Sequence, residues 1–499
     1  MNLFEAVAEH ARSDRPALCT GPRVLDYGGL LSLVEQTSRA LVAAGVEPGA
    51  RLVVLLPNSV EHVVAILAAG VVGAIAVPCD PRAGRVRLAR VIAETSPHLC
   101  LLPPGAEPQT DSDSLQFEID LAARTACFTP ASVGRAERSA RRTVETCEAV
   151  IRFTSGSTGR PKGVVLEHEQ LVATARMVSQ LFGLEGDHRE LVVTPISHSG
   201  GWQRVAATLV GGGCVVLPEE PFSLPAMLGD IEVFDAHGFF APPPVIRLLL
   251  AAGPRAADAL AGCRSIEVGS AALGASELAG LLQLVPAARV FVHYGLTECS
   301  RALVLDARAH PAKLDTVGRP APGVDVEVRD EDGRRLAADS TGQVFLRGPQ
   351  LGRRYFGRPD LDAERFVEGW LATGDYGRLD SQGFLELLGR RDDRIESAGY
   401  SFFPAEVEAE LGPVDGVEQY FIAGVPDPRE ILGEIPWAFV VPSEPEHFSP
   451  RSFAQQAQRK LPGYMVPRKV VALPELPLTA SGKPDRRSAV ETHALTGDG

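Results

Sequence analysis

Residues 153–164 combine side chains and spacing that suit phosphate chemistry. They read Phe-Thr-Ser-Gly-Ser-Thr-Gly-Arg-Pro-Lys-Gly-Val, and an apolar run precedes them, so we expect a strand that enters a loop closed by Lys162. Phosphate oxygens need backbone N–H groups without a Cβ in the way, hydroxyl donors and a cation. The segment therefore predicts a phosphate-binding loop. A Walker A loop is excluded, because Pro161 stands where the second glycine would be required. A flexible exposed turn, the alternative, accounts poorly for Lys162 and the hydroxyl run.

The elements that must position this loop alternate along the chain. Helical patterns such as residues 30–44 and 60–69 are interspersed with short apolar runs typical of buried strands, at residues 52–56, 74–77, 150–153, 191–193, 215–217 and 290–293. This alternation predicts an α/β fold with stacked, mostly buried sheets. Residues 103–149, rich in Pro, Ser, Asp and Arg, are expected to form an irregular excursion.

A second, smaller domain is expected after a charged, turn-prone joint at residues 389–393. Beyond it we expect a helix at 404–411, strands at 417–425 and 437–441, and a helix at 450–460, which make a small α+β domain. The predicted domains are residues 1–389 and residues 390–499.

Composition excludes several classes of protein. The chain has 499 residues and a formal net charge of −14, which disfavours a nucleic-acid partner, and the Arg cluster at 135–142 is interrupted by Glu137. Its eight Cys show no C-x-x-C pair, and the start lacks a signal-peptide pattern, so a cytoplasmic protein with reduced thiols is expected. The apolar stretch 63–79 is too short for a membrane span and predicts a helix, a glycine turn and a strand ending at Pro78.

Several further segments occur in the order found in one family. The sequence resembles the adenylate-forming superfamily of acyl-CoA synthetases, luciferases and peptide-synthetase adenylation domains, and the resemblance covers nearly the whole chain. Besides residues 154–163, it is carried by Val-Gly-Ser-Ala-Ala-Leu at 268–273, Tyr-Gly-Leu-Thr-Glu at 294–298, Val-Gly-Arg-Pro at 317–320, Ala-Thr-Gly-Asp at 372–375, Gly-Arg-Arg-Asp-Asp at 389–393 and Leu-Thr-Ala-Ser-Gly-Lys at 478–483.

The resemblance implies a large ATP- and acid-binding domain and a small mobile domain. It implies ATP, Mg²⁺ and coenzyme A, or a carrier-protein phosphopantetheine, as cofactors, with Glu298 as the metal ligand. The implied nucleotide-binding residues are Thr154, Ser155, Gly156, Ser157, Thr158, Gly159, Lys162, Gly269, Ser270, Ala271, Tyr294, Gly295, Thr297, Asp375 and Arg390. Taken alone, Thr297-Glu298 would fit a helix cap and Asp375 a structural turn.

The implied catalytic residues are Thr154, His198, Glu298 and Lys483. Lys483 would lie on the small domain. It would bridge the carboxylate of the acid and the α-phosphate of ATP, where negative charge accumulates during the reaction. Asp392 matches the family's hinge, about which the small domain reorients between two half-reactions. A surface lysine in a Ser-Gly-Lys turn is the alternative reading of Lys483.

The acid itself is expected to lack an α-amino group. Relatives that activate amino acids place an Asp where this chain has His198, and a His there resembles the gate residue of acyl- and aryl-acid activators. The resemblance places Trp202, Phe239, Phe240, Gly269 and Gly295 around the acid. These residues favour an apolar or cyclic acid, although the aromatic ones could equally be ordinary core.

The acceptor of the acyl group is less firmly indicated. Glu396 stands at a usual Lys, Ala398 at a usual Gly and Gln343 at a common Glu. The leading hypothesis is an acid:CoA ligase, and its close rival stops at the adenylate or delivers it to an acyl-carrier protein. A non-catalytic nucleotide-binding module is the alternative of another class, and the absence of a G-x-S-x-G elbow excludes an α/β-type serine hydrolase. The oligomeric state stays open.

Overall fold

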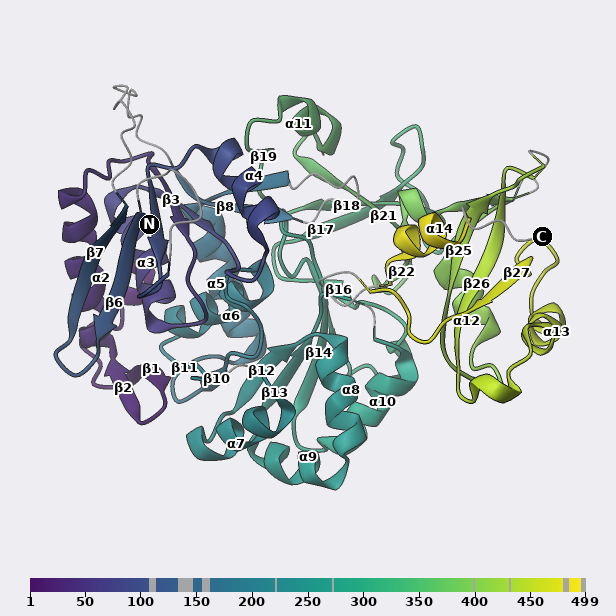
Figure 1. Cartoon of the computed structure of the whole chain (residues 1–499), viewed down its shortest axis with the longest axis horizontal. Coiled ribbons are helices and arrows are strands. Elements are labelled where there is room, and N and C mark those ends of the chain that lie inside the picture. The colour runs from purple at the N-terminus through teal and green to yellow at the C-terminus, as the bar shows by residue number, and fades with distance from the viewer. Residues whose placement is uncertain are drawn as a thin grey trace. The chain divides into compact units, whose positions relative to one another are not determined.

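The computed structural model of this chain describes residues 1–106, 114–132, 147–154, 162–219, 222–271, 273–397, 400–429, 432–478 and 484–494. The chain divides into two compact units: unit 1 comprises Met1–Asp325 and Leu346–Leu371, and unit 2 comprises Val326–Phe345 and Ala372–Gly499. Both units mix helices and strands (Figure 1), so the predicted α/β class, with a large N-terminal and a smaller C-terminal part, is confirmed. The boundary expected between residues 389 and 390 falls inside unit 2 and stays a prediction.

Sheet A of unit 1 is parallel through its middle and antiparallel at its edges. Its central strands β12 and β13 are buried at every residue, as expected for strands covered on both faces. In spatial order the strands are β16 (Arg319–Pro320), β15 (Leu303–Asp306), β14 (Arg289–Tyr294), β13 (Ser265–Val268), β12 (Gly238–Ala241), β10 (Arg189–Leu191), β11 (Cys214–Val216), β1 (Pro16–Thr20) and β2 (Arg23–Asp26). The helical segments in this part of the chain are α6 (Ser199–Val210), α7 (Leu224–Phe234), α8 (Pro243–Ala252), α9 (Pro254–Ala259), η1 (Leu260–Gly262), α10 (Ala275–Leu284) and η2 (Pro311–Lys313).

Sheet B of unit 1 carries the predicted phosphate loop between two of its strands. In spatial order the strands are β19 (Arg354–Tyr355), β9 (Lys162–Glu167), β8 (Glu148–Thr154), β4 (Ile75–Pro78), β3 (Arg51–Val54), β5 (Leu99–Leu102), β6 (Ser114–Asp120) and β7 (Thr125–Ser132). The associated helices are α1 (Leu3–Ala8), α2 (Tyr27–Ala43), α3 (Val60–Val72), α4 (Arg85–Thr95), α5 (His168–Phe182) and α11 (Pro359–Arg365). One hydrophobic core joins side chains of both sheets with those of α2, α3, α5 and α6.

Two expectations about this part of the chain have clear outcomes. The stretch 63–79 forms the predicted helix α3, a turn at Gly73 with φ of 74°, and strand β4 ending at Pro78. No helix in the described ranges is both long and apolar enough to cross a membrane. The irregular excursion expected at residues 103–149 was partly wrong, because β6 and β7 form an antiparallel hairpin there. Phe117 and Phe128 stack across the hairpin with ring centroids 4.6 Å apart. The apolar residues alternate along these strands, but the polar flanking residues had obscured this pattern in the sequence.

Unit 2 contains two larger sheets and a short hairpin. The first sheet has the strands β17 (Asp325–Arg329), β18 (Thr341–Arg347), β21 (Trp370–Leu379) and β22 (Leu385–Arg390), and the division between the units runs through β17, β18 and β21. The short strand β20 (Phe366–Val367), which pairs with β21, belongs to unit 1. The second has β25 (Val417–Pro426), β26 (Glu434–Pro442) and β27 (Lys469–Ala472). The hairpin is β23 (Ile395–Ser397) with β24 (Tyr400–Phe402), and the helical segments are η3 (Arg391–Asp393), α12 (Pro404–Leu411), η4 (Pro445–His447), α13 (Pro450–Lys460) and α14 (Arg486–Ala494).

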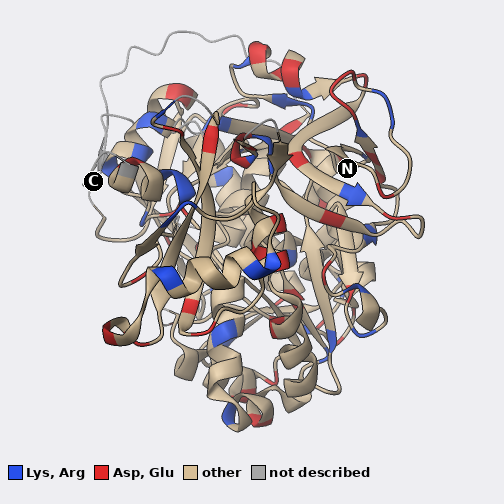
Figure 2. Cartoon of the chain, turned by 90° about the vertical axis from the view of Figure 1, so that its right-hand side faces the viewer, with Lys and Arg blue, Asp and Glu red and all other residues tan. Residues whose placement is uncertain are grey.

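Basic and acidic residues are scattered among other residues on the elements that face the viewer in Figure 2. Ion pairs within unit 2 include Arg378 with Glu386 at 3.1 Å and Arg486 with Glu408 at 2.9 Å. Such half-exposed pairs contribute little to stability, about 0–1 kcal/mol each.

Candidate active site

The β8–β9 hairpin of sheet B places Thr154 opposite Lys162. Both side chains are half-buried, and the Thr154 hydroxyl reaches the carbonyl oxygen of Lys162 at 3.5 Å. Gly163 is required here, because a Cβ would lie 2.9 Å from Cγ2 of Ile151. The hairpin therefore fixes the two ends of the predicted phosphate loop. The predicted loop residues Ser155, Gly156, Ser157, Thr158 and Gly159 lie outside the described residues.

The carboxylate of Glu298 lies beside this hairpin. The Tyr355 hydroxyl donates a hydrogen bond to Oε1 of Glu298 at 2.5 Å, and Tyr355 itself pairs with Val164 of β9. The Gly352 N–H donates to the carbonyl oxygen of Glu298 at 2.7 Å. Burial, and then the negative charge of Glu298, raises the pKa of Tyr355 well above its ordinary value, so the phenol keeps its proton at neutral pH. Sequence analysis missed Tyr355, because nothing in its local pattern distinguishes it from a core aromatic residue.

The turn that carries Glu298 is tightly folded. Its predicted nucleotide-binding members Tyr294 and Gly295 lead from β14 into the turn, and a Cβ on Gly295 would lie 2.5 Å from the backbone nitrogen of Arg301. Arg301 adopts a left-handed backbone with φ of 51°, a conformation that a non-glycine residue holds only when its surroundings enforce it. Thr297, the predicted phosphate ligand, is half-buried on the same turn.

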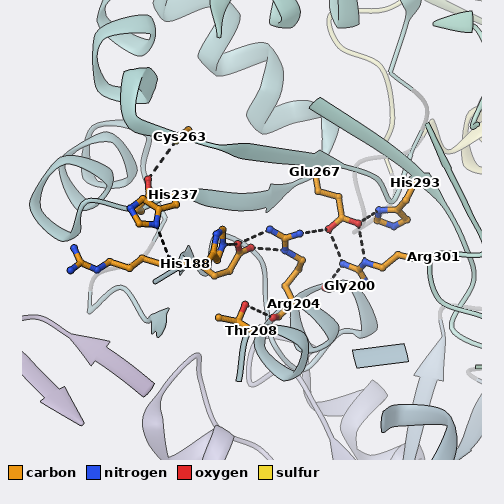
Figure 3. A network of polar contacts seen from close by, with 12 residues as sticks. His188, Gly200, Arg204, Thr208, His237, Cys263, Glu267, His293 and Arg301 are labelled. Atoms are coloured by element: carbon orange, nitrogen blue, oxygen red, sulfur yellow. Dashed lines mark hydrogen bonds and ion pairs between the residues drawn. The ribbon is translucent and has the colours of Figure 1, made fainter. Parts of the chain in front are cut away.

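A buried ion-pair network holds this turn in place (Figure 3). Arg301 is fully buried and donates two hydrogen bonds to Glu267 of β13, at 2.8 and 3.1 Å. It also donates to the carbonyl oxygen of Gly200 in α6 at 3.0 Å. Nδ1 of His293 lies 2.6 Å from Oε1 of Glu267. Arg301 thus ties the Glu298 turn to the start of α6, two residues beyond His198, and to the strand that leads into Gly269.

The same network continues to sheet A through a second arginine. Arg204 of α6 donates to both carboxylate oxygens of Glu190 at 2.6 Å, and its Nη1 lies 3.4 Å from Glu267. His188 completes it with a hydrogen bond of 2.9 Å to Glu190. Desolvation alone would raise the pKa values of Glu190 and Glu267, but the neighbouring arginines hold both below the ordinary range. Both carboxylates therefore stay charged and paired.

His198, the predicted gate residue, occupies the N-cap position of α6, and its side chain makes no capping hydrogen bond. Its ring is 60% exposed, and Nε2 lies 3.9 Å from Oδ2 of Asp80. Asn58 fixes the preceding turn, accepting a hydrogen bond from the Ile196 N–H at 2.9 Å and donating one to the carbonyl oxygen of Thr194 at 3.0 Å. Desolvation by the surrounding protein lowers the pKa of His198 although Asp80 opposes it, so the ring is mainly neutral near pH 7. A neutral imidazole in this position could donate a hydrogen bond to a carboxylate.

The residues predicted around the acid divide into two groups. Trp202 and Phe239 are 1% and 0% exposed, and Trp202 belongs to the main core of unit 1, so their contact with an acid stays a prediction. The Phe240 ring lies 5.3 Å from the His293 ring. A Cβ on Gly269 would collide with that same His293 ring, so only glycine fits there. The structure thus brings Phe240 and Gly269 together around His293, a residue that sequence analysis did not select. Ser270 and Ala271 follow Gly269 directly, and Ser270 is exposed with φ of 74°.

In unit 2 the predicted nucleotide-binding residues Asp375 and Arg390 are neighbours. Asp375 of β21 is paired in register with Arg390 of β22, and Nε of Arg390 lies 2.7 Å from Oδ1 of Asp375. Thr373 supports the strand by accepting a hydrogen bond from the Asp375 N–H at 3.0 Å. The predicted hinge residue Asp392 is exposed within η3. Lys483 lies outside the described residues, and its role stays a prediction.

Comparisons with known proteins agree with this arrangement. The family model described as AMP-binding enzyme matches residues 4–356, and the model of the AMP-binding enzyme C-terminal domain matches residues 406–483. The chain belongs to the AMP-binding enzyme family. This AMP-binding enzyme is an adenylate-forming ligase, as the order of its motifs had indicated. The predicted joint lies in the segment between the two matched regions.

Named relatives of this AMP-binding enzyme include a feruloyl-CoA synthase from Amycolatopsis sp., 32% identical over 93% of each chain. A probable non-canonical nonribosomal peptide synthetase, CymA from Salinispora arenicola, is 31% identical over 99% of this chain and 6% of its own. Among solved structures, the amide bond synthetase McbA from Marinactinospora thermotolerans has a TM-score of 0.85 and 27% identity, covering 98% of this chain and 99% of that one. The o-succinylbenzoate CoA synthetase from Bacillus subtilis, solved with its acyl-adenylate intermediate, has a TM-score of 0.82 and 25% identity, covering 98% and 97%.

Proposed function

We propose that this enzyme uses ATP to convert a carboxylic acid into its acyl-adenylate and then transfers the acyl group to the thiol of coenzyme A. The observation that carries the proposal is the Glu298 carboxylate held by Tyr355 against the β8–β9 hairpin, between whose strands the predicted phosphate loop runs. An acid and a cation near one hairpin suit a nucleoside triphosphate with its metal ion.

The first half-reaction joins a carboxylate oxygen of the acid to the α-phosphorus of ATP, and the bond from that phosphorus to the pyrophosphate oxygen breaks. Two anions must approach each other, so the site has to offset negative charge and hold the attack in line. In our proposal Thr154 and Lys162 hold phosphate oxygens, and His198 orients the acid. Lys483 offsets the charge at the reacting phosphorus.

Mg²⁺ fits the residues present. Within the described ranges no three His, Cys, Asp or Glu side chains gather into a metal cage. Mg²⁺ in nucleotide sites is commonly held by one or two carboxylates together with phosphate oxygens and water, so a single Glu298 suffices. When bound, the ion would neutralise phosphate charge. Asp375 and Arg390, on adjacent strands of unit 2, would bind the ribose hydroxyls.

The acid is proposed to be apolar or aromatic and to lack an α-amino group. His198 itself offers no negative charge to an ammonium group, and the resemblance places the aromatic residue Phe240 around the acid. The feruloyl-CoA synthase relative bears the name of an aryl acid, which supports this class.

Coenzyme A is the leading acceptor, and two others have specific support. Glu396 stands at a position where a lysine is usual, and it forms an ion pair of 2.8 Å with Arg394 in unit 2. This departure lies in the segment that would shape the thioester-forming arrangement. The similarity to a peptide synthetase supports a carrier-protein thiol, and the similarity to an amide bond synthetase supports an amine.

The test supplies the purified enzyme with ATP, Mg²⁺ and a panel of aryl, cyclic and aliphatic acids, and follows pyrophosphate. Acids that release pyrophosphate are then offered coenzyme A, a phosphopantetheinylated carrier protein, or a primary amine, and products are identified by mass spectrometry. We expect an aryl acid to release pyrophosphate and coenzyme A to yield a thioester. An absence of acid-dependent pyrophosphate exchange with every acid would instead favour a non-catalytic nucleotide-binding module.

A further inference from the structure

Arg152 is a buried cation with no acidic partner among the residues that the structure describes. It lies on β8, two residues before Thr154, and is 3% exposed. Its Nη1 donates a hydrogen bond to the carbonyl oxygen of Ser197 at 2.8 Å. Its Nε and Nη2 have no hydrogen-bond partner in the part of the chain that the structure describes, and no carboxylate there forms an ion pair with it. Buried polar groups are nearly always partnered, so this one requires an explanation.

The two other deeply buried arginines described in unit 1 each pair with a buried glutamate. Arg204 binds both oxygens of Glu190, and Arg301 binds both oxygens of Glu267. A buried ion without a counter-charge is strongly unfavourable. Desolvation accordingly lowers the pKa of Arg152 to about 9, which still leaves the guanidinium charged at pH 7. Among the described residues of unit 1, Arg152 is thus a buried positive charge without an ion-pair partner.

The position of Arg152 connects it with the proposed acid site. Side chains alternate along a strand, so Arg152 lies on the same face of β8 as Thr154, where the phosphate loop begins. The carbonyl that it binds belongs to the residue just before His198. Desolvation is the main cause of the lowered pKa of His198, and the positive charges of Arg152, Arg87 and Arg82 lower it further, against the opposing charge of Asp80.

A second observation at the same place points to an anion. The helix α6, of 12 residues, begins at Ser199, directly after His198, and its first N–H groups carry the partial positive charge of a helix N-terminus. The Ser199 hydroxyl is also buried and has no hydrogen-bond partner among the described residues. A guanidinium, a helix N-terminus and a free hydroxyl therefore meet around the turn that carries His198.

We propose that Arg152 is the resident counter-charge for the carboxylate of the acid substrate, which it draws to the His198 turn and the N-terminus of α6. This inference rests on the proposed function and adds the group that selects a carboxylate. Arg152 is a positioning residue, because its charge acts through the Ser197–His198 turn and the poorly screened interior rather than by contact. The substrate carboxylate then supplies the partner that no described carboxylate supplies to Arg152 by an ion pair; the nearby Asp80 pairs with Arg82 instead.

The test compares the wild-type enzyme with Arg152→Met, Arg152→Gln and Arg152→Lys, using an acid that supports pyrophosphate release. The Michaelis constants for acid and ATP are measured separately. The affinity for the acid is also compared with the affinity for its neutral primary amide, which is measured as a competitive inhibitor. Arg308→Met is the matched control, because Arg308 also binds backbone carbonyls, those of Leu282, Val285 and Ala288.

We expect Arg152→Met and Arg152→Gln to raise the KM for the acid at least tenfold while the KM for ATP changes less than twofold. Both variants should also lose most of the preference for carboxylate over amide, and Arg152→Lys should keep it. If Arg152→Met fails to fold, Arg152→Gln and Arg152→Lys decide the question. An unchanged carboxylate preference in the charge-free variants would overturn the inference and leave the proposed function standing. A wild-type enzyme that releases no pyrophosphate with any acid would overturn both.

Discussion

The phenol of Tyr355 donates a hydrogen bond of 2.5 Å to Glu298, a residue 57 positions earlier in the chain. Because Tyr355 pairs with Val164 on the neighbouring strand, this bond links the Glu298 turn to the β8–β9 hairpin. The hydrogen bond fixes the Glu298 carboxylate relative to Thr154 and Lys162, because Tyr355 lies on β19 and β19 pairs with β9. It is the arrangement that a metal-bound nucleotide would need in order to be held from two sides.

Tyr355→Phe is expected to lower the rate of adenylate formation about 10- to 100-fold, the usual effect of removing a group that orients a metal ligand. The Mg²⁺ concentration that gives half the maximal rate should rise, since Glu298 loses the donor that orients it. The control is Tyr27→Phe, which removes a buried hydroxyl bonded to the carbonyl oxygens of Leu209 and Gly213. An equal response of both variants to Mg²⁺ would contradict the role assigned to Tyr355.

Glu267→Gln is expected to destabilise the enzyme by about 3–5 kcal/mol, because it leaves the buried charge of Arg301 without its partner. The free energy of unfolding, measured by chemical denaturation, checks this. Glu219→Gln, which removes an exposed pair with Arg23, should change it by less than about 1 kcal/mol. If the two losses are similar, the network in Figure 3 does not hold the Glu298 turn as described.

His62 should make the stability of unit 1 depend on pH. Burial lowers the pKa of His62 to about 4 in the folded enzyme, against 6.5 in the unfolded chain. Between these values the unfolded chain binds a proton that the folded enzyme does not, so stability falls as pH falls. The loss from this group is about 2 kcal/mol between pH 7.5 and pH 5.

His62→Gln should remove that part of the pH dependence while retaining a donor for the carbonyl oxygen of Leu56. His447, which is 79% exposed, provides the comparison, and His447→Gln should follow the wild-type profile. Identical pH profiles for wild type and His62→Gln, measured by denaturation at several pH values, would refute the assignment.

Lys483→Ala is expected to reduce adenylate formation sharply and to leave the fold intact, since the sequence predicts a Ser-Gly-Lys turn and a lysine in such a turn usually contributes little to stability. Acid-dependent exchange of pyrophosphate into ATP measures the first effect, and thermal unfolding measures the second. Lys469→Ala, which removes a lysine placed over the Trp437 ring in the same unit, serves as control. Wild-type exchange in the Lys483 variant would show that the role is misassigned.

Local patterns predicted the elements of the chain well, and long-range contacts escaped them. The helices expected at 404–411 and 450–460 coincide with α12 and α13, because each opens with proline and repeats its apolar residues at helical spacing. The strand expected at 417–425 is β25 with one further residue. By contrast, the bond between Tyr355 and Glu298 depends on the pairing of β19 with β9, which no local pattern encodes. The charge pairing of Arg301 and Glu267 depends in the same way on tertiary contacts.

Arg152 shows a different limit of sequence reasoning. Its position on an apolar strand is visible in the sequence, but a single charge in such a strand is as consistent with an edge as with burial. Only the structure reveals that the guanidinium is buried and has no acidic partner among the described residues.

The central claim is that a carboxylate oxygen of the acid attacks the α-phosphorus of ATP. An acid labelled with oxygen-18 in its carboxylate, converted with ATP and coenzyme A and analysed by mass spectrometry, tests it most directly. We expect one labelled oxygen in AMP, because the oxygen that bridges carbonyl and phosphorus leaves with the nucleotide when the thiol attacks. Unlabelled AMP, or the label in inorganic phosphate together with ADP, would contradict it.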